Sequence, residues 1–342
     1  MVSASTPPRI SKIADAVGVS TATVSNALSG KGRVSAKTVE LVRAAAKELG
    51  YVASPAGRAL RTGKSHVLGL VLPDIANPLF PQIAQAIGAA AAKAGYAVLI
   101  GDARGDRYTQ AETTSRLIER GVDGMVVIPR RGTRITEVRC PVAMIDTPST
   151  PGNTVAADHW QGGQQITAHL AKLGHRKVGL IANHPNSNVQ NDRIGGMRST
   201  PGLVTRTIWT ERLQKNPNGD MMGLARMLRQ GFTAFATVSD LLALRVLTEL
   251  QRIRVSVPEH VSVTGFDDLV WAPVITPSLT TMRMNMTAIA EIAVEALADA
   301  INRGEHGSIV QAAIRKVPMS LVVRQSSAPP PENKPSEGEQ AI

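Results

Sequence analysis

Polar side chains that could hydrogen-bond a small molecule recur just after short apolar runs along most of this chain. They are Asp74, Asn77, Asp102, Asp146, Asn183, Ser239, Asp240, Asp267 and Asp268. Carboxylates, amides and hydroxyls gathered in one place can bind and orient a hydroxyl-rich ligand. A single such residue would mean little, because loops are polar anyway. Their recurrence favours a hydrogen-bonding cleft over ordinary solvated turns.

Only ten residues are aromatic, and three of them stand beside these polar groups. Phe80 follows an Asn-Pro turn, Trp160 lies two residues after Asp158, and Trp271 follows an Asp-Asp pair. An aromatic face against ring C–H groups, with carboxylates and amides bonding the adjacent hydroxyls, is one way in which proteins hold a sugar. Phe80 and Trp271 could equally fill a hydrophobic core, so both interpretations stay open at this point.

The sequence lacks the patterns that would support catalysis or cofactor binding. It contains no GxGxxG fingerprint, P-loop, GxSxG elbow or HExxH motif, and its seven histidines do not have metal-ligand spacing. Asp267 and Asp268 could suggest acid–base chemistry. Adjacent side chains usually diverge, however, which favours ligand binding by one carboxylate and a structural role for the other. We therefore expect no catalytic residue, cofactor or metal.

The polar residues follow apolar runs that alternate with amphipathic helical segments. Strands are expected at 67–72, 97–101, 124–128, 142–145, 178–182, 234–238 and 261–266, and helices at about 80–93 and 109–120. Such alternation predicts parallel sheets covered by helices. In open sheets of this kind ligands bind beyond the carboxyl ends of the strands, where the polar residues stand.

The N-terminal segment 13–28 has the spacing of a helix, a tight turn and a second helix. Gly18 can adopt the turn conformation that other residues resist, and Ser20 can cap the second helix. The apolar face of the two helices comprises Ile13, Ala14, Val17, Val24, Ala27 and Leu28. Short side chains that could enter a DNA groove lie on the outer face: Thr21, Ala22, Ser25 and Asn26. The segment is typical of a helix-turn-helix.

A third helix is expected over 35–49, which would complete a three-helix headpiece. Residues 1–64 hold ten Lys or Arg against three acids, a balance of +7, so the whole-chain charge of +11 leaves only +4 for the other 278 residues. A small helical bundle without a nucleic-acid role is the plain alternative. The concentration of positive charge on this segment favours DNA binding, because phosphates must be neutralised.

Other features of the sequence concern membrane or export signals, the single cysteine and the C-terminal tail. No stretch approaches the roughly 20 apolar residues of a membrane helix, and the N-terminus lacks a secretory apolar region, so a cytoplasmic protein without a membrane partner is expected. The single cysteine, Cys140, precedes Pro141 and an apolar run, which indicates a buried thiol. The tail, residues 326–342, is rich in Pro, Ser, Glu and Gln, and its composition predicts disorder.

Seven segments together resemble the lactose and galactose repressor (LacI/GalR) family of bacterial transcription regulators, over nearly all of residues 10–325. They are VGVSTATVSNAL, VSAKTVELVRAAAKELGY, DGMVVIP, GHRKVGLIA, SVTGFDD, PSLTTMRMNM and SLVVRQS. The resemblance implies an α/β protein: a helix-turn-helix headpiece, a hinge, and a core of two parallel-sheet subdomains similar to periplasmic sugar-binding proteins. It therefore predicts both a DNA-binding part and a ligand-binding part.

The resemblance also implies domain boundaries. The headpiece would span 1–52, the hinge helix and linker 53–65, and the effector-binding and dimerisation core 66–325, followed by the tail 326–342. Within the core, the N-subdomain would comprise about 66–160 and 287–317, and the C-subdomain about 161–286 and 318–325. The chain would cross between them near residues 160, 286 and 318.

DNA-contacting roles follow from the matched positions. Thr21, Ala22 and Asn26 match positions that face bases in the major groove, Ser20, Thr23 and Ser25 match positions near phosphates, and Leu60 matches an apolar wedge in the minor groove. The hinge departs from the family pattern at Ala53, Ser54 and Gly57. A glycine in so short a helix costs about 0.5 to 1 kcal/mol relative to alanine, which favours a hinge helix that folds only on DNA.

Effector-contacting roles follow in the same way. Positions that match the family's pocket are Asn77, Phe80, Asp158, Arg193, Ser239, Asp240 and Asp267. Met286 stands where several relatives carry a ring. The segment from Gly196 to Ala234 is shorter than the family norm and lacks most of one helix, close to Arg193 in sequence.

The resemblance and the residues together predict a homodimeric repressor on a pseudo-palindromic operator, switched by a small effector such as a sugar or sugar phosphate. Effector binding would change the angle between subdomains and the separation of the hinge helices. Two other classes remain as alternatives: a solute-binding protein, which would need an export signal and has no use for residues 1–60, and a sugar-modifying enzyme whose helical N-terminus does not bind DNA.

Overall fold

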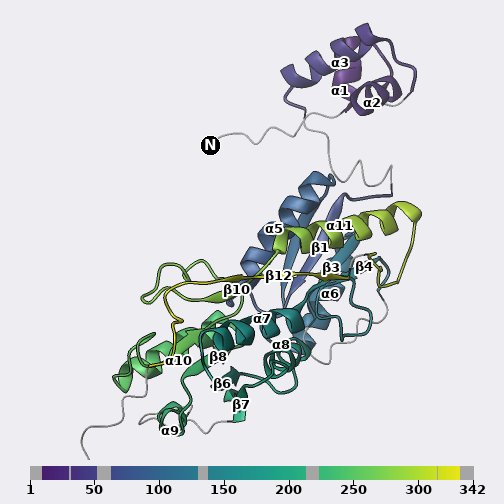
Figure 1. The fold of residues 1–342 in the computed structure, drawn as a ribbon. Coiled ribbons are helices and arrows are strands. Elements are labelled where there is room, and N and C mark those ends of the chain that lie inside the picture. The colour runs from purple at the N-terminus through teal and green to yellow at the C-terminus, as the bar shows by residue number, and fades with distance from the viewer. Residues whose placement is uncertain are drawn as a thin grey trace, which may run out of the picture. The chain divides into compact units, whose positions relative to one another are not determined.

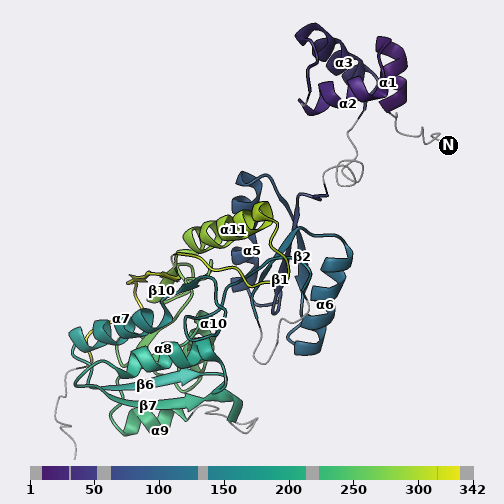
Figure 2. The same ribbon diagram turned by 90° about the vertical axis from the view of Figure 1, so that its right-hand side faces the viewer.

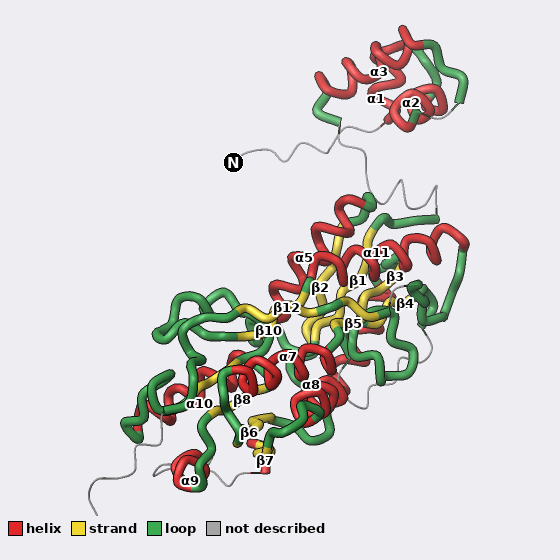
Figure 3. Tube along the Cα trace, in the orientation of Figure 1, coloured by secondary structure: helices red, strands yellow, loops and turns green. Residues whose placement is uncertain are grey.

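The structure is a computed structural model that describes residues 10–30, 32–51, 63–129, 138–212, 223–313 and 315–331. The chain divides into two compact units, Met1–Ser65 and His66–Ile342. Figure 1 shows the fold of each, and Figure 3 distinguishes helices from strands. The hinge region around Leu60 lies outside the described residues, so the wedge assignment stays a prediction.

The first unit is a three-helix headpiece of α1 (Ile10–Val17), α2 (Thr21–Ser29) and α3 (Ala36–Glu48). Gly18 turns the chain between the first two helices at φ +71°, a conformation that favours glycine. Ser20 and Ser35 cap α2 and α3 by accepting hydrogen bonds from the backbone N–H groups three residues on. The three helices enclose a small apolar core formed by Ile13, Ala14, Val24, Ala27, Val42 and Ala46. These features confirm the predicted helix-turn-helix.

The N-subdomain sheet has the strand order β2-β1-β3-β4, and all its pairs are parallel. The strands are β1 (Val67–Leu72), β2 (Ala97–Asp102), β3 (Gly124–Val127) and β4 (Val142–Met144). Helices α5 (Leu79–Lys93) and α11 (Met286–Arg303) lie together on one face, and α6 (Arg107–Glu119) covers the other (Figure 2). Side chains alternate along β1, so Leu70 packs with the α5 and α11 cluster and Val71 with Leu117 of α6.

The C-subdomain sheet repeats this plan with the strand order β7-β6-β8-β9. Its strands are β6 (Lys177–Ala182), β7 (Val204–Trp209), β8 (Ala234–Thr237) and β9 (Ser262–Thr264), and its helices are α7 (His159–Lys172), α8 (Asn188–Arg198), α9 (Leu224–Arg229) and α10 (Asp240–Arg252). A 3-10 turn, η1 (Thr210–Arg212), follows β7. The predicted α/β fold of two parallel sheets is thereby confirmed.

Two short strand pairs lie where the chain passes from one sheet to the other. β5 (Ala156–Ala157) pairs in parallel with β11 (Lys316–Val317) just before α7, and β10 (Thr281–Met284) pairs antiparallel with β12 (Met319–Val322) just before α11. Three passages of backbone therefore join the subdomains side by side. The segment from Gly196 to Ala234, which we expect to be shorter than the family norm, contains β7 and the six-residue helix α9; residues 213–222 lie outside the described part.

The expectation that order ends at Ser326 is wrong for the first residues of the tail. The Ser326 hydroxyl is buried, donates to the Val263 carbonyl at 2.6 Å and accepts from the Thr280 N–H at 2.8 Å. Ala328 N–H donates to Ser262 Oγ at 3.0 Å. The tail therefore bonds along β9 at Ser326 and Ala328, while Ser327 bonds His169 and Thr280. Residues 332–342 lie outside the described residues.

Three further points concern the described residues alone. No helix among them is long and apolar enough to cross a membrane. They also hold no group of three or more His, Cys, Asp or Glu side chains arranged to bind a metal. Cys140 is buried, and burial raises the pKa of its thiol to about 11, so it stays protonated at neutral pH.

Candidate functional site

A cavity of about 1200 Å³ lies at the carboxyl ends of the strands and is lined from both subdomains. Five of the residues expected to contact an effector line it: Asn77, Phe80, Arg193, Ser239 and Asp267. Asp74, Asp146 and Asn183, which also follow strands, lie on its wall. The volume is slightly above the roughly 300 to 1,000 Å³ of typical small-ligand sites, so a small organic ligand fits with room to spare.

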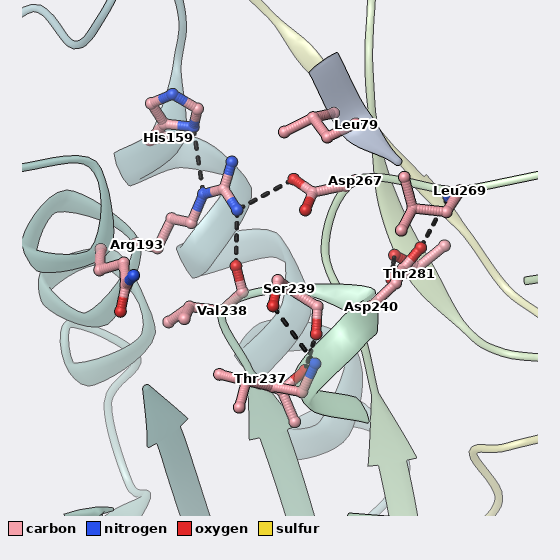
Figure 4. A network of polar contacts seen from close by, with 12 residues as sticks. Leu79, His159, Arg193, Thr237, Val238, Ser239, Asp240, Asp267, Leu269 and Thr281 are labelled. Carbon is pink, nitrogen blue, oxygen red and sulfur yellow. Dashed lines mark hydrogen bonds and ion pairs between the residues drawn. The ribbon is translucent and has the colours of Figure 1, made fainter. Parts of the chain in front are cut away.

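Arg193 is the central cation of the cavity. Helix α8, which Ser187 caps, carries it into the interior, where the side chain is 6% exposed. Its Nη1 donates to the Val238 carbonyl at 2.5 Å and lies 3.0 Å from Asp267 Oδ1 (Figure 4). The guanidinium carbon is 4.0 Å from the centre of the Phe266 ring, a cation–π contact. These contacts fix the guanidinium before any ligand arrives.

His159 is a site residue that sequence reasoning missed. It begins α7, is buried on the cavity wall, and accepts a hydrogen bond at Nδ1 from Arg193 Nε at 3.3 Å. Burial lowers the His159 pKa well below 6.5, and the positive charge of Arg193 lowers it further. A hydrogen bond to the Asp146 backbone acts in the opposite direction. The ring is therefore neutral with its proton on Nε2. Its position directly after Asp158, at the first crossing, was the only sequence signal.

Asp267 turns into the cavity on an unusual backbone. It has φ +115° and Asp268 has φ +51°, conformations that L-residues rarely adopt. The Asp267 N–H donates to the Met282 carbonyl at 2.8 Å, which anchors the turn to β10. Burial raises the pKa of Asp267 to about 6, and the Arg193 cation limits the rise, so the carboxylate is ionised at neutral pH.

The adjacent Asp268 points elsewhere. Arg283 Nε donates to one of its carboxylate oxygens at 2.6 Å, and Arg324 Nη2 lies 2.7 Å from the other. It therefore joins the turn to β10 and to the chain after β12. Because one carboxylate faces the cavity and its neighbour holds the backbone together, the pair does not form an acid–base couple.

Two residues expected at the effector lie off the cavity wall, and we withdraw both from the set of contacts. Asp240 is fully buried: Oδ1 accepts from Thr281 Oγ1 at 2.6 Å and Oδ2 from the Leu269 N–H at 2.8 Å, so its carboxylate braces the Asp267 turn from behind (Figure 4). Burial, together with the negative charge of Asp267, raises the pKa of Asp240 to about 7.

Asp158 lies elsewhere. It caps α7 by accepting a hydrogen bond from the Gln161 N–H at 3.1 Å, and it lines a separate cavity of about 350 Å³.

Of the three aromatic residues that were candidates for stacking on a sugar, only Phe80 reaches the large cavity. Trp160, 47% exposed, lines the small one and lies over Gly195, whereas Trp271 packs against the apolar cluster around α10. The prediction that Trp160 or Trp271 stacks on a sugar in the large cavity is therefore wrong, because neither side chain lines that cavity.

Hydrogen bonds join the subdomains beside the cavity. Asp192 of α8 accepts from Thr147 Oγ1 and from Ser149 Oγ, the latter at 3.1 Å, and Asn188 Nδ2 donates to Thr150 Oγ1 at 3.0 Å. We call these contacts the latch: Thr147, Ser149 and Thr150 from the loop after β4, and Asn188 and Asp192 from α8. Any change in the angle between subdomains must break or remake them.

The second candidate site is the outer face of α2 in the headpiece. Thr21, Ala22 and Asn26 are exposed, while Thr23 and Ser25 are half-buried. Ser20 Oγ and Thr23 Oγ1 lie 2.9 Å apart within the cap. A Cβ built at Gly32, which has φ +85°, would lie 3.2 Å from Asn26 Nδ2, so the loop after α2 sets the space available to the Asn26 amide.

Comparison with known proteins gives two family matches. Residues 9–54 match bacterial regulatory proteins of the lacI family, and residues 167–327 match a periplasmic binding protein-like domain. The transcriptional regulator MalR of Streptomyces coelicolor is 30% identical over 86% of this chain and 90% of its own length. The transcriptional repressor CytR of Escherichia coli is 30% identical over 90% of this chain and 93% of its own length.

A solved structure shows the same fold. The Lac repressor dimer bound to operator and the anti-inducer ONPF is 24% identical, has a TM-score of 0.76, and covers 94% of this chain and all of its own. These matches confirm the resemblance read from the sequence.

Proposed function

The chain belongs to the lacI family of bacterial regulatory proteins and is a DNA-binding transcription regulator, and we propose that it is a repressor controlled by a small sugar-like molecule in its cavity. The observation that carries this proposal is a preorganised polar site, Arg193 with Asp267, on a cavity lined by both subdomains of a chain that also has a helix-turn-helix. We propose no catalytic role, since relatives are named as regulators and Arg193 holds both Asp267 and His159.

The outer face of α2 would read the operator in the major groove. Asn26 can hydrogen-bond two edges of an adenine, Thr21 can accept or donate one hydrogen bond, and Ala22 can offer a methyl contact. Ser20, Thr23 and Ser25 would lie near phosphates. Leu60, if the hinge folds on DNA, would be the apolar wedge in the minor groove.

The matched Lac repressor structure is a dimer on its operator, and we propose a homodimer on a pseudo-palindromic site for this chain too. A protein that acts on the bacterial chromosome works in the cytoplasm. A ligand that touches both cavity walls would favour one angle between subdomains, and it can shift operator affinity only through different affinities for the two states.

Fluorescence polarisation of the full chain on duplex DNA from upstream of its own gene tests the proposal. We expect tight binding to one pseudo-palindromic segment and weak binding to a scrambled duplex of equal composition. Asn26→Ala should weaken the specific complex by about 1 to 3 kcal/mol and leave non-specific binding nearly unchanged. Equal losses on both duplexes would show that Asn26 does not read bases, and equal wild-type affinity for both would contradict sequence-specific regulation.

A further inference from the structure

A second cavity, of about 350 Å³, lies apart from the large one. It is lined by Pro148, Ser149, Asp158, Trp160, Asp192 and Lys316, and the large cavity shares none of these residues. They come from four segments: the loop after β4, the start of α7, helix α8 and strand β11. The small cavity therefore touches both subdomains and two of the passages of backbone between them.

The charged groups on the small cavity have opposite signs and do not neutralise one another. Asp158 accepts a hydrogen bond from a backbone N–H, and Asp192 accepts hydrogen bonds from two hydroxyl groups. Among the described residues, neither of these carboxylates forms an ion pair, and nor does Lys316. A carboxylate offers about four acceptor sites, so both retain the capacity to bind a donor. All three groups can therefore bind a ligand without giving up a charged partner.

Trp160 adds an apolar surface to the small cavity. One side of its indole lies on α8, where a Cβ at Gly195 would collide with the ring. The side chain is nevertheless 47% exposed, although tryptophan is highly buried on average. An indole that is held against a helix and still open to the cavity can pack on the carbon atoms of a ligand, and its face attracts a nearby ammonium group.

The mixture of charges selects the class of ligand. A phosphate or another plain anion would bind Lys316 but would face two carboxylates. An alkyl ammonium ion would bind the carboxylates but would face Lys316. A molecule that carries both an ammonium and a carboxylate group satisfies both signs. The volume is near the lower end of the roughly 300 to 1,000 Å³ of small-ligand sites, which suits a molecule of the size of an amino acid.

We propose that the small cavity binds a zwitterion of the amino-acid class. Its ammonium group lies between Asp158 and Asp192, its carboxylate bonds Lys316, and its side chain packs on Trp160. Asp192 also belongs to the latch, so this ligand contacts the place where the two subdomains are joined. The proposal goes beyond the regulator function and does not depend on it, because neither DNA nor a sugar takes part in the binding.

Isothermal titration of the full chain with each proteinogenic L-amino acid tests the proposal. Every amino acid that binds is then compared with the amine that lacks its carboxylate and with the acid that lacks its ammonium group. For leucine these analogues are isopentylamine and isocaproate, and for phenylalanine they are phenethylamine and hydrocinnamate. We expect at least one amino acid to bind about tenfold or more tightly than both of its analogues. Binding of no amino acid, or an analogue that binds as tightly as its parent, would overturn the proposal.

Two variants that each remove one charge locate the bound amino acid. Lys316→Met keeps most of the side-chain length, and it should lower the affinity for the amino acid about tenfold without weakening binding of the matched amine. Asp158→Asn should weaken the amino acid and the amine alike, again about tenfold, because both carry the ammonium group. Asparagine can still cap α7, so this variant keeps the helix start.

Two control variants complete the experiment. Arg315→Met removes the exposed cation next to Lys316, which does not line the small cavity, and Asn186→Ala truncates a side chain on the wall of the large one. Both should bind the amino acid as the wild type does. Amino-acid affinity that is unchanged in Lys316→Met and Asp158→Asn, or that falls equally in either control, would overturn the assignment to this cavity.

Discussion

Arg193 and Asp267 form an ion pair of 3.0 Å in which both side chains are 6% exposed, although they lie 74 positions apart in the chain. The pair joins α8 to the turn after β9 and aims one carboxylate at the cavity. A buried pair of this kind contributes little net stability, because desolvation offsets the attraction, but losing one partner leaves a buried charge. Its value is the preorganisation of the ligand site.

Asp267→Ala should therefore affect stability and ligand binding together. The unpaired Arg193 should lower the free energy of unfolding by about 3 to 5 kcal/mol, measured by urea denaturation, and binding of the sugar-like effector should be lost. Asp268→Ala is the comparison variant, since it also removes a buried, ion-paired carboxylate but lies off the cavity wall. It should destabilise the core and keep ligand binding. An unchanged ligand affinity in Asp267→Ala would remove this residue from the site.

The pKa of Asp240 predicts a pH dependence of stability. The unfolded carboxyl releases its proton near pH 3.8, whereas the folded one keeps it to about pH 7 because of burial and the Asp267 charge. The contribution of Asp240 to stability is thus fully present below about pH 4 and is lost as pH rises to 7, on the order of 4 kcal/mol in all.

Asp240→Asn should remove this dependence. Relative to the wild type, the variant should gain free energy of unfolding steadily between pH 4 and pH 7 and stay level above pH 7, in urea titrations at matched ionic strength. Comparing the two proteins at each pH cancels the opposite effect of His159, whose lowered pKa costs stability as pH falls below 6.5. A difference that does not vary with pH would show that Asp240 is ionised throughout.

Gly32→Ala should disturb base reading through Asn26. The new methyl would lie 3.2 Å from the Asn26 amide nitrogen, in addition to the strain of a positive φ, which costs on the order of 1 kcal/mol. Gly50→Ala has similar strain at φ +64° but nothing within 4 Å. We expect similar headpiece stabilities and a larger loss of specific DNA affinity in Gly32→Ala. Equal DNA affinities for the two variants would rule out this coupling.

The latch predicts a residue that tunes affinity without touching ligand. Asp192 accepts hydrogen bonds from the loop after β4 and lies outside the large cavity, so Asp192→Ala should change the balance between subdomain angles. Affinity for the sugar-like effector should shift severalfold, or about 1 kcal/mol, while the ratio of the affinities for two different sugars stays constant. Asn191→Ala, the exposed neighbour, is the control. A change in the ratio would mean that Asp192 contacts the ligand.

The sequence predicted what depends on local pattern. Strands such as β1 and β6 appear as continuous apolar runs because both faces of their sheets are covered, and helix ends appear as capping serines. The alternating edge strand β7 was missed, because an edge strand carries polar residues. The buried serines after β12 were misread for the same reason: composition cannot show where a hydroxyl finds a partner.

At the site, strand ends located the correct edge of each sheet but not the direction of each side chain. Asn77 and Ser239 reach the cavity, whereas Asp102 bonds the Ile75 and Arg104 backbones and Asp240 turns behind the Asp267 loop. The positive φ at Asp267 and Asp268, which separates their roles, leaves no mark in residue type. His159 was missed because its partner Arg193 lies 34 positions away.

Operator affinity with and without ligand tests the central claim most directly. Polarisation titrations of the full chain on its operator duplex are run with no ligand and with the sugar that binds the cavity most tightly at saturation, and they should give dissociation constants that differ by about tenfold or more. By thermodynamic reciprocity, operator DNA should change the affinity for this sugar by the same factor. Equal operator affinity in both titrations, with the cavity shown to be saturated, would contradict the account.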